Sequence, residues 1–132
     1  MFQGANMESS NKTLLVIDDD EENCELLKRR FEKRGFKVES ASDGQEGLMA
    51  LALNDVNLVF LDLNMPLMNG FTFLEKVKMN KNHREIPVFV TSSLDDEDTI
   101  NDCLSYGANG FIPKPYDMDK MLGCIKECLD DE

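Results

Sequence analysis

The sequence predicts a single α/β domain built on a parallel sheet of five strands, with helices on both faces. Short apolar runs alternate along the chain with longer segments whose apolar residues recur at three- and four-residue spacing, a pattern typical of βαβ units. Carboxylates come directly after two of the apolar runs: Asp18 and Asp19 after Leu14–Ile17, and Asp62 after Leu58–Leu61. Because parallel strands deliver the residues after their last positions to one edge of the sheet, we expect these acids to lie close together.

Hydrophobic spacing and one glycine define the first two strands and the helix between them. Leu14–Ile17 is wholly apolar and predicts a buried strand. The helix after it has one apolar stripe, made of Cys24, Leu27 and Phe31. Gly35 is the candidate for a left-handed residue at the end of this helix. Phe36–Ala41 alternates apolar with polar side chains, which predicts an edge strand with one solvated face.

A capping pattern marks the second helix. Asp43 and Glu46 have the spacing of a capping box and precede a helical stripe. That stripe is made of Leu48, Leu51 and Ala52. The third strand, Leu58–Leu61, contains no polar residue, so we predict it in the interior of the sheet.

Turn and cap residues delimit the next helices. A loop ends in Asn69-Gly70, and the third helix comes next with an apolar stripe made of Phe71, Leu74 and Val77. The fourth strand, Pro87–Val90, delivers Thr91 to the same sheet edge as the acids. Ser93 is the predicted N-cap of the fourth helix, and Gly107 ends it. The stripe of this helix is made of Ile100, Cys103 and Leu104.

A short strand and an amphipathic helix complete the pattern. Gly110–Ile112 is followed by Pro113, Lys114 and Pro115, and a proline there requires the strand to lie at an edge of the sheet. The last helix has apolar residues at three- and four-residue spacing, namely Met118, Met121, Leu122, Ile125 and Leu129.

The strand order is determined by which strands are suited to an edge. Strands two and five have edge features and strands one, three and four are interior, as the three-layer, doubly wound, flavodoxin-like order 2-1-3-4-5 requires. In that order the ligand crevice lies between strands one and three, where Asp18, Asp19 and Asp62 meet. Thr91 and Lys114 reach the same edge. Clustered carboxylates repel one another, and a divalent cation relieves that repulsion.

Composition argues against two classes of protein. The net charge is −12, from 26 acidic and 14 basic residues, so the chain lacks the basic surface that direct nucleic-acid binding requires. No apolar stretch approaches the roughly 20 residues that cross a bilayer, and no basic and apolar leader opens the chain. We therefore expect a cytoplasmic protein that acts neither on DNA directly nor in a membrane.

Cysteine spacing argues against a metal site made of thiolates. Cys24, Cys103, Cys124 and Cys128 fall at helix positions without the paired spacing of metal ligands. Buried, reduced thiols are therefore predicted, although Cys124 and Cys128 stand one helical turn apart, which leaves a metal or redox role open for this pair. Residues 1–10 have no periodic pattern and are interpreted as a leader, so the domain is expected to comprise residues 11–132.

Four segments of the chain resemble the receiver domains of two-component response regulators. They are Val-Ile-Asp-Asp-Asp (16–20), Leu-Asp-Leu-Asn-Met-Pro-Leu-Met-Asn-Gly (61–70), Val-Thr-Ser (90–92) and Phe-Ile-Pro-Lys-Pro-Tyr (111–116). Any one of these strings is a weak signal, whereas all of them in this order and at these spacings are highly specific. The resemblance extends from Lys12 to the end of the chain.

The resemblance implies that Asp62 accepts a phosphoryl group. The donor would be a phosphohistidine of a histidine kinase or of a histidine phosphotransfer protein, and the downstream partner is unspecified. Mg²⁺, with Mn²⁺ as a substitute, would be bound by Asp19, Asp62 and the backbone carbonyl of Asn64, while Asp18 would hold it through water. Such a domain signals and is not an enzyme, beyond its own phosphotransfer and autodephosphorylation.

The resemblance also assigns the residues around the phosphoryl group. Lys114 and the hydroxyl of Thr91 would contact its oxygens, and backbone amides near Leu63, Asn64 and Ser92 would complete the site. These roles agree with the chemistry of phosphoryl transfer, which needs mainly positioning and charge neutralisation from the protein.

A two-state switch is implied on the surface made by the last two helices and the fifth strand. Thr91 would move toward the phosphoryl group, and the ring of Phe111 would turn into the space released. Phe111 lacks the hydroxyl of the tyrosine common in receivers, and Ser92 replaces a common alanine. The Lys114-Pro115 bond would be cis. The last helices lack the dimer-forming charge pattern of the winged-helix regulators, so we expect a monomer or weak dimer.

Other classes agree less well with the sequence. A degenerate receiver that binds partners without phosphorylation would normally lack an acid or the lysine. A haloacid-dehalogenase-like phosphatase needs a second acid where this chain has Asn64. A flavodoxin-type electron carrier binds phosphate after strand one, where Asp18, Asp19 and Asp20 would repel it. An EF-hand needs alternating acids and a glycine, which these contiguous acids do not provide.

Overall fold

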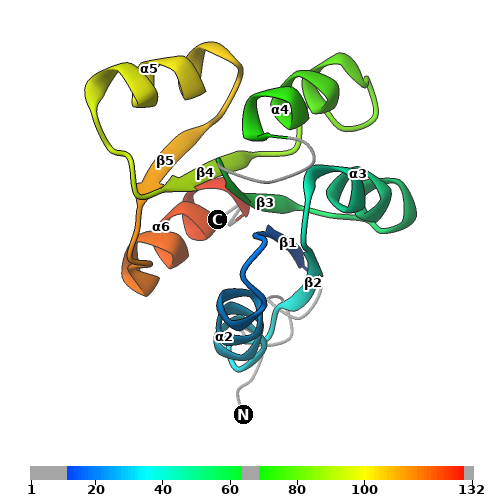
Figure 1. Cartoon of the computed structure of the whole chain (residues 1–132). Coiled ribbons are helices and arrows are strands. Elements are labelled where there is room, and N and C mark those ends of the chain that lie inside the picture. Colours follow the sequence, from blue (N-terminus) through cyan, green and yellow to red (C-terminus); the bar gives the residue numbers. More distant parts are fainter. Residues whose placement is uncertain (1–11, 64–68, 130–132) are drawn as a thin grey trace.

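Five parallel strands form one sheet in the computed structural model, which describes residues 12–63 and 69–129 (Figure 1). The strands are β1 (Thr13–Ile17), β2 (Lys37–Ala41), β3 (Leu58–Asp62), β4 (Val88–Ser92) and β5 (Gly110–Pro113). The helices are α2 (Glu21–Glu32), α3 (Gly44–Leu53), α4 (Gly70–Met79), α5 (Glu97–Ser105) and α6 (Met118–Leu129). The order is β2-β1-β3-β4-β5, which confirms the predicted fold class.

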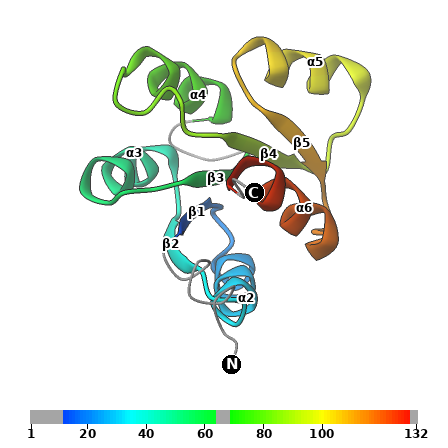
Figure 2. The same ribbon diagram turned by 180° about the vertical axis from the view of Figure 1, so that it is seen from behind.

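Helices cover both faces of the sheet. Figures 1 and 2 show α3, α4 and α5 on one face and α2 and α6 on the other. Successive strand residues point to opposite faces, so each strand contributes to two separate hydrophobic clusters. In β1, for example, Leu14 and Val16 belong to the cluster under α2 and α6, whereas Leu15 and Ile17 belong to the cluster under α3, α4 and α5.

A row of aromatic rings fills the cluster under α2 and α6. Phe31 of α2 stacks on Phe60 of β3 with ring centres 5.7 Å apart and an interplanar angle of 4°. Phe89 of β4 lies 6.3 Å from Phe60, and Phe36 meets Phe31 edge-on at 6.3 Å. Phe31 and Phe60 are at most 1% exposed, so packing of this row holds α2 against β3 and β4.

Side-chain caps fix where several helices begin. The predicted capping-box spacing at α3 is confirmed for the N-cap, since Asp43 accepts the amide of Glu46 at 2.8 Å, but the return bond goes to Ser42, the residue before the cap. The carboxylate of Glu46 accepts the backbone amide and hydroxyl of Ser42 in return. The prediction of Ser93 as the N-cap of α5 is wrong. Asp96 caps that helix by accepting the amide of Thr99 at 3.1 Å, because the chain runs through a loop after β4 before it becomes helical.

Two glycines have a left-handed backbone, which was expected of Gly35. Gly35 has φ 95° and Gly107 has φ 104°, a conformation that costs a residue with a Cβ appreciable strain. At Gly107 a Cβ would also lie 2.9 Å from the Lys78 side chain. At both positions any other residue would therefore be strained.

The ends of several elements differ slightly from the predicted ends. β4 continues to Ser92, so Thr91 lies within the strand instead of after it, while β2 begins at Lys37, one residue later than predicted. Pro113 lies in β5, an edge strand, as its chemistry requires. The Lys114-Pro115 bond is cis, as the family resemblance implied.

Candidate functional site

The acidic centre lies at the carboxyl edge of the sheet, on the face covered by α2 and α6. Phe60 and Phe89 point to that face, and strand alternation therefore places Asp62 and Thr91, two residues further along β3 and β4, on the same face. Asp62 and Thr91 are direct neighbours in the register of these strands. Asp18 comes after β1 at the same edge, where its amide donates to the carbonyl of Ala41.

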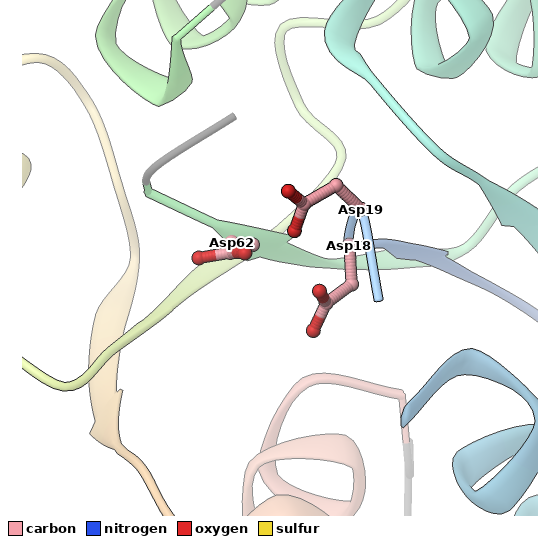
Figure 3. Close-up of side chains that lie close together, drawn as sticks. All are labelled: Asp18, Asp19 and Asp62. Carbon is pink, nitrogen blue, oxygen red and sulfur yellow. The ribbon is translucent and has the colours of Figure 1, made fainter. Parts of the chain in front are cut away.

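Three carboxylates converge there as predicted. Asp18, Asp19 and Asp62 each offer an oxygen, and these atoms all lie within 4.8 Å of one another. Figure 3 shows the side chains of Asp18 and Asp19 diverging from the end of β1, with Asp18 on the side of α6. Asp18 and Asp62 are 1% and 5% exposed, whereas Asp19 is exposed. A cation that enters from solvent therefore meets Asp19 first.

Lys114 provides the positive charge within this acidic centre. Its Nζ lies 3.5 Å from Oδ2 of Asp62 and 3.7 Å from Oδ2 of Asp18. The side chain is about one quarter exposed, with 24% of its surface accessible, so its ammonium keeps access to water. The lysine thus bridges the two buried carboxylates, and the amide of its own backbone donates to the carbonyl of Ser92 at 2.8 Å.

Asp18 accepts donors from two sides. Its Oδ1 accepts the amide of Asp20 at 2.9 Å, and its Oδ2 accepts the side-chain amide of Asn23 at 3.5 Å. The hydroxyl of Tyr116 also donates to Oδ2. Asp20 itself is the N-cap of α2, where its side chain accepts the amides of Glu22 and Asn23.

Tyr116 is the site residue that the sequence did not reveal. It comes directly after cis Pro115, between β5 and α6, and its ring is half-buried against the cluster under α2 and α6. Burial, followed by its hydrogen bond to the Asp18 carboxylate, raises the pKa of its hydroxyl well above the ordinary range. The phenol therefore stays protonated and remains a hydrogen-bond donor.

The other predicted phosphoryl contacts lie next to the acids. Thr91 is 1% exposed, and its hydroxyl donates to the carbonyl of Leu61 at 3.5 Å. Ser92 is equally buried, and its hydroxyl accepts the amide of Leu94 at 3.0 Å. The amide of Leu63 donates to the carbonyl of Thr91 at 3.0 Å. Asn64 lies outside the described residues.

The predicted switch residue Phe111 lies on a different face from the acids. It is half-buried and packs against the cluster under α3, α4 and α5. Its partner in β4 is Val90, the neighbour of Thr91. The structure thus places Phe111 next to the site along the backbone but across the sheet from it.

The expectation that all the cysteines are buried is only partly right. Cys24 and Cys103 are buried, whereas Cys124 is half-buried and Cys128 is exposed. Apolar spacing predicted the inner stripe of α6 correctly at Met121 and Ile125, but spacing alone does not show where neighbouring elements stop covering a helix. Among the described residues, the only clustered candidate metal ligands are the acids Asp18, Asp19 and Asp62.

Thiol reactivity should therefore differ sharply between Cys24 and Cys128. Cys24 donates to the carbonyl of Asp18 at 3.4 Å, and burial, followed by the charge of Asp18, raises its pKa from 9.0 to about 11. In native protein at pH 8, we expect iodoacetamide to modify Cys128 first and to leave Cys24 unmodified, as measured by peptide mass spectrometry. Unfolded protein, in which all thiols should react, is the control, and early labelling of Cys24 would contradict the structure.

The same shift has a consequence for alkaline stability. The folded state keeps the Cys24 proton up to about pH 11, whereas a free thiol loses it near 9.0. Between these values the unfolded chain binds fewer protons than the folded chain, so stability falls as the pH rises. The stabilisation of the folded state by this buried thiol is fully present below pH 9.0 and is lost as the pH rises toward about 11.

The donor set of the acidic centre suits a hard divalent cation. Asp18, Asp19 and Asp62 offer only oxygen ligands, which are preferred by Mg²⁺, Ca²⁺ and Mn²⁺ over softer metals. Three carboxylates and one lysine leave a formal charge of −2, which a divalent cation would neutralise. The site combines a buried carboxylate, a place for a cation and an ammonium group.

Comparison with known proteins gives one consistent result. The model of the response regulator receiver domain family matches residues 14–126. The chain is 32% identical over 117 residues to the response regulator SaeR of Staphylococcus aureus, covering 88% of this chain and 50% of that protein. The chain therefore spans about half the length of this curated relative.

Solved structures show the same fold. CheY4, a chemotaxis protein of Vibrio cholerae, superposes with a TM-score of 0.84 at 24% identity, over 89% of this chain and 98% of that chain. A CheY-like receiver domain protein of Methanospirillum hungatei has a TM-score of 0.82 at 29% identity, over 91% and 94% of the two chains. Within the described part of the chain, no helix is both long and apolar enough to span a membrane.

Proposed function

The chain belongs to the family of response regulator receiver domains, and from this premise we propose that it carries a signal by accepting a phosphoryl group on Asp62. The observation that carries the proposal is the position of this carboxylate. Asp62 ends the central strand, is buried, and lies beside both Lys114 and the two acids that come after β1. Asp19 is exposed, whereas Asp62 is buried beside Thr91 in the strand register and lies 3.5 Å from the Lys114 ammonium, so Asp62 is the acid best placed to act as nucleophile.

We propose that the acidic centre uses Mg²⁺. Asp19 and Asp62 would bind the ion directly, and Asp18 would bind it through water. This arrangement agrees with the usual coordination of Mg²⁺ in proteins, which has one or two carboxylates and several waters. When bound, the ion would neutralise the carboxylates and the incoming phosphoryl oxygens. Mn²⁺ has the same ligand preference and would be the substitute.

The residues of the chain then have distinct roles in the transfer. An oxygen of the Asp62 carboxylate attacks the phosphorus atom, the bond between phosphorus and the donor histidine nitrogen breaks, and the electron pair returns to the imidazole. The Lys114 ammonium, 3.5 Å from Asp62, holds a phosphoryl oxygen and offsets its charge. Thr91, next to Asp62 in the register, supplies a hydroxyl to another oxygen.

We further propose the partners and the output of this reaction. The donor is a histidine kinase or a histidine phosphotransfer protein, and the domain turns over no external substrate. Phosphorylation biases the surface of α5, β5 and α6 through Thr91 and Phe111. The domain acts in the cytoplasm as a monomer or weak dimer and reaches its target by protein contact.

Phosphoryl uptake from a small donor tests the proposal directly. Protein incubated with acetyl phosphate and Mg²⁺ should give a retarded band on a phosphate-affinity gel, and the band should disappear with EDTA. Hydroxylamine, which cleaves acyl phosphates, should also remove it. The absence of a retarded band with Mg²⁺ would instead favour a receiver that only binds partners.

A further inference from the structure

Tyr116 reaches the acidic centre through its hydroxyl, which donates to Asp18 and also contacts the Thr91 side chain. Its ring is half-buried in the cluster under α2 and α6, and the Nζ of Lys114 lies 5.7 Å from the ring centre. Hydrophobic packing and the lysine thus fix the ring from two directions. Replacement of this tyrosine by phenylalanine would keep these ring contacts and remove the hydroxyl, and with it the hydrogen bond to Asp18 and the contact with the Thr91 side chain.

The hydrogen bond falls on the more crowded oxygen of Asp18. Oδ2 accepts both the Tyr116 hydroxyl and, at 3.5 Å, the side-chain amide of Asn23. The ammonium of Lys114 lies 3.7 Å from the same atom. Oδ1 accepts the amide of Asp20 at 2.9 Å. A carboxylate has about four lone-pair sites, so most of the capacity of Asp18 is already in use.

These donors oppose the role that a metal would require of Asp18. An ion held through water offers its own water hydrogens to the carboxylate, so the phenol and the metal-bound water compete for the same acceptor. Figure 3 shows Asp18 on the side of α6, diverging from Asp19, which is the side from which Tyr116 donates.

We propose that Tyr116 is a positioning residue that competes with the divalent cation for Asp18 and thereby raises the Mg²⁺ concentration that the site needs. The inference rests on the proposed function, because it assigns Asp18 to a metal site. Tyr116 lies just before α6, so its hydroxyl connects the acidic centre to the segment that leads into this helix.

Mg²⁺ binding without any phosphodonor is the appropriate test. Calorimetry on Tyr116→Phe should give a Kd for Mg²⁺ about fivefold lower than that of the wild type, the effect of removing one net hydrogen bond of ordinary strength. Tyr106→Phe is the matched control, because Tyr106 packs on Phe71 at 4.9 Å between α4 and α5, and its Kd should equal that of the wild type. A gain of affinity is not the result of damage to the fold.

A second measurement does not require the Tyr116 variant. The chain has 2 tyrosines, so Tyr116 is the only one left in Tyr106→Phe, and Mg²⁺ should shift its ultraviolet absorption band as the hydroxyl loses its carboxylate partner. Suppose that the wild type binds Mg²⁺. Unchanged or weaker Mg²⁺ binding by Tyr116→Phe, or a tyrosine band that Mg²⁺ does not shift, would then overturn the inference about Tyr116 and leave the proposed metal site intact. A wild type that binds no Mg²⁺ overturns the proposed metal as well.

Discussion

Asp62→Asn is expected to lose phosphoryl uptake by more than about a thousandfold, because a carboxamide has no anionic oxygen to attack phosphorus. The substitution keeps the shape of the side chain at the end of β3, so the five-stranded sheet and its order should be retained. The measurement is the fraction of retarded protein on a phosphate-affinity gel after incubation with acetyl phosphate and Mg²⁺, over a series of times.

Asp55→Asn is the matched control for this experiment. Asp55 is exposed and precedes the amino end of β3, whereas Asp62 lies at its carboxyl end. The same chemical change near the opposite end of one strand should leave phosphoryl uptake unchanged. Persistent uptake by Asp62→Asn would place the phosphoryl group elsewhere, and peptide mass spectrometry of the phosphorylated protein would identify the residue.

Phe60→Ala should destabilise the folded domain by about 3–5 kcal/mol. Phe60 is 1% exposed, stacks on Phe31 at 5.7 Å and has Phe89 at 6.3 Å. Removal of its ring leaves a cavity between α2 and the strands β3 and β4. Since domains of this kind have total stabilities of about 5–15 kcal/mol, much of the protein could unfold at physiological temperature.

Urea unfolding followed by far-ultraviolet circular dichroism measures this loss. Met79→Ala is the control, because Met79 is 83% exposed and such a surface change should alter stability by less than about 0.5 kcal/mol. A loss below about 1 kcal/mol in Phe60→Ala would mean that neighbouring side chains collapse into the space. The aromatic row would then contribute less to stability than its burial indicates.

The fold was predictable because local signals agreed with one another. Alternation in Phe36–Ala41 indicated an edge strand and the wholly apolar Leu58–Leu61 an interior one, and these two constraints nearly determine the strand order. The first residue of α5 was harder to predict from the sequence. Acidic residues fill positions 95–98, three of them aspartates that can cap a helix, and only the path of the chain after β4 selects Asp96.

The predicted acids came together because strand topology decides their position. Tyr116 was missed because its partner, Asp18, lies 98 residues away in the sequence, and no periodic pattern connects a phenol to a distant carboxylate. The string Lys-Pro-Tyr contributes to the family resemblance without indicating a role for the phenol. A hydroxyl placed two residues after Lys114 was the available signal.

The alternation of side chains along β4 and β5 separates two routes out of the site. Asp62 and Thr91 share a face with α6, and Tyr116 leads from Asp18 into that helix. Phe111 belongs to the opposite face, with α5. Side chains in contact thus connect the acids to the start of α6, whereas Phe111 packs across the sheet from them, under α5. If phosphorylation alters both surfaces, as we propose, a partner that docks on both helices would detect two separate changes, one transmitted through Tyr116 and one through the sheet.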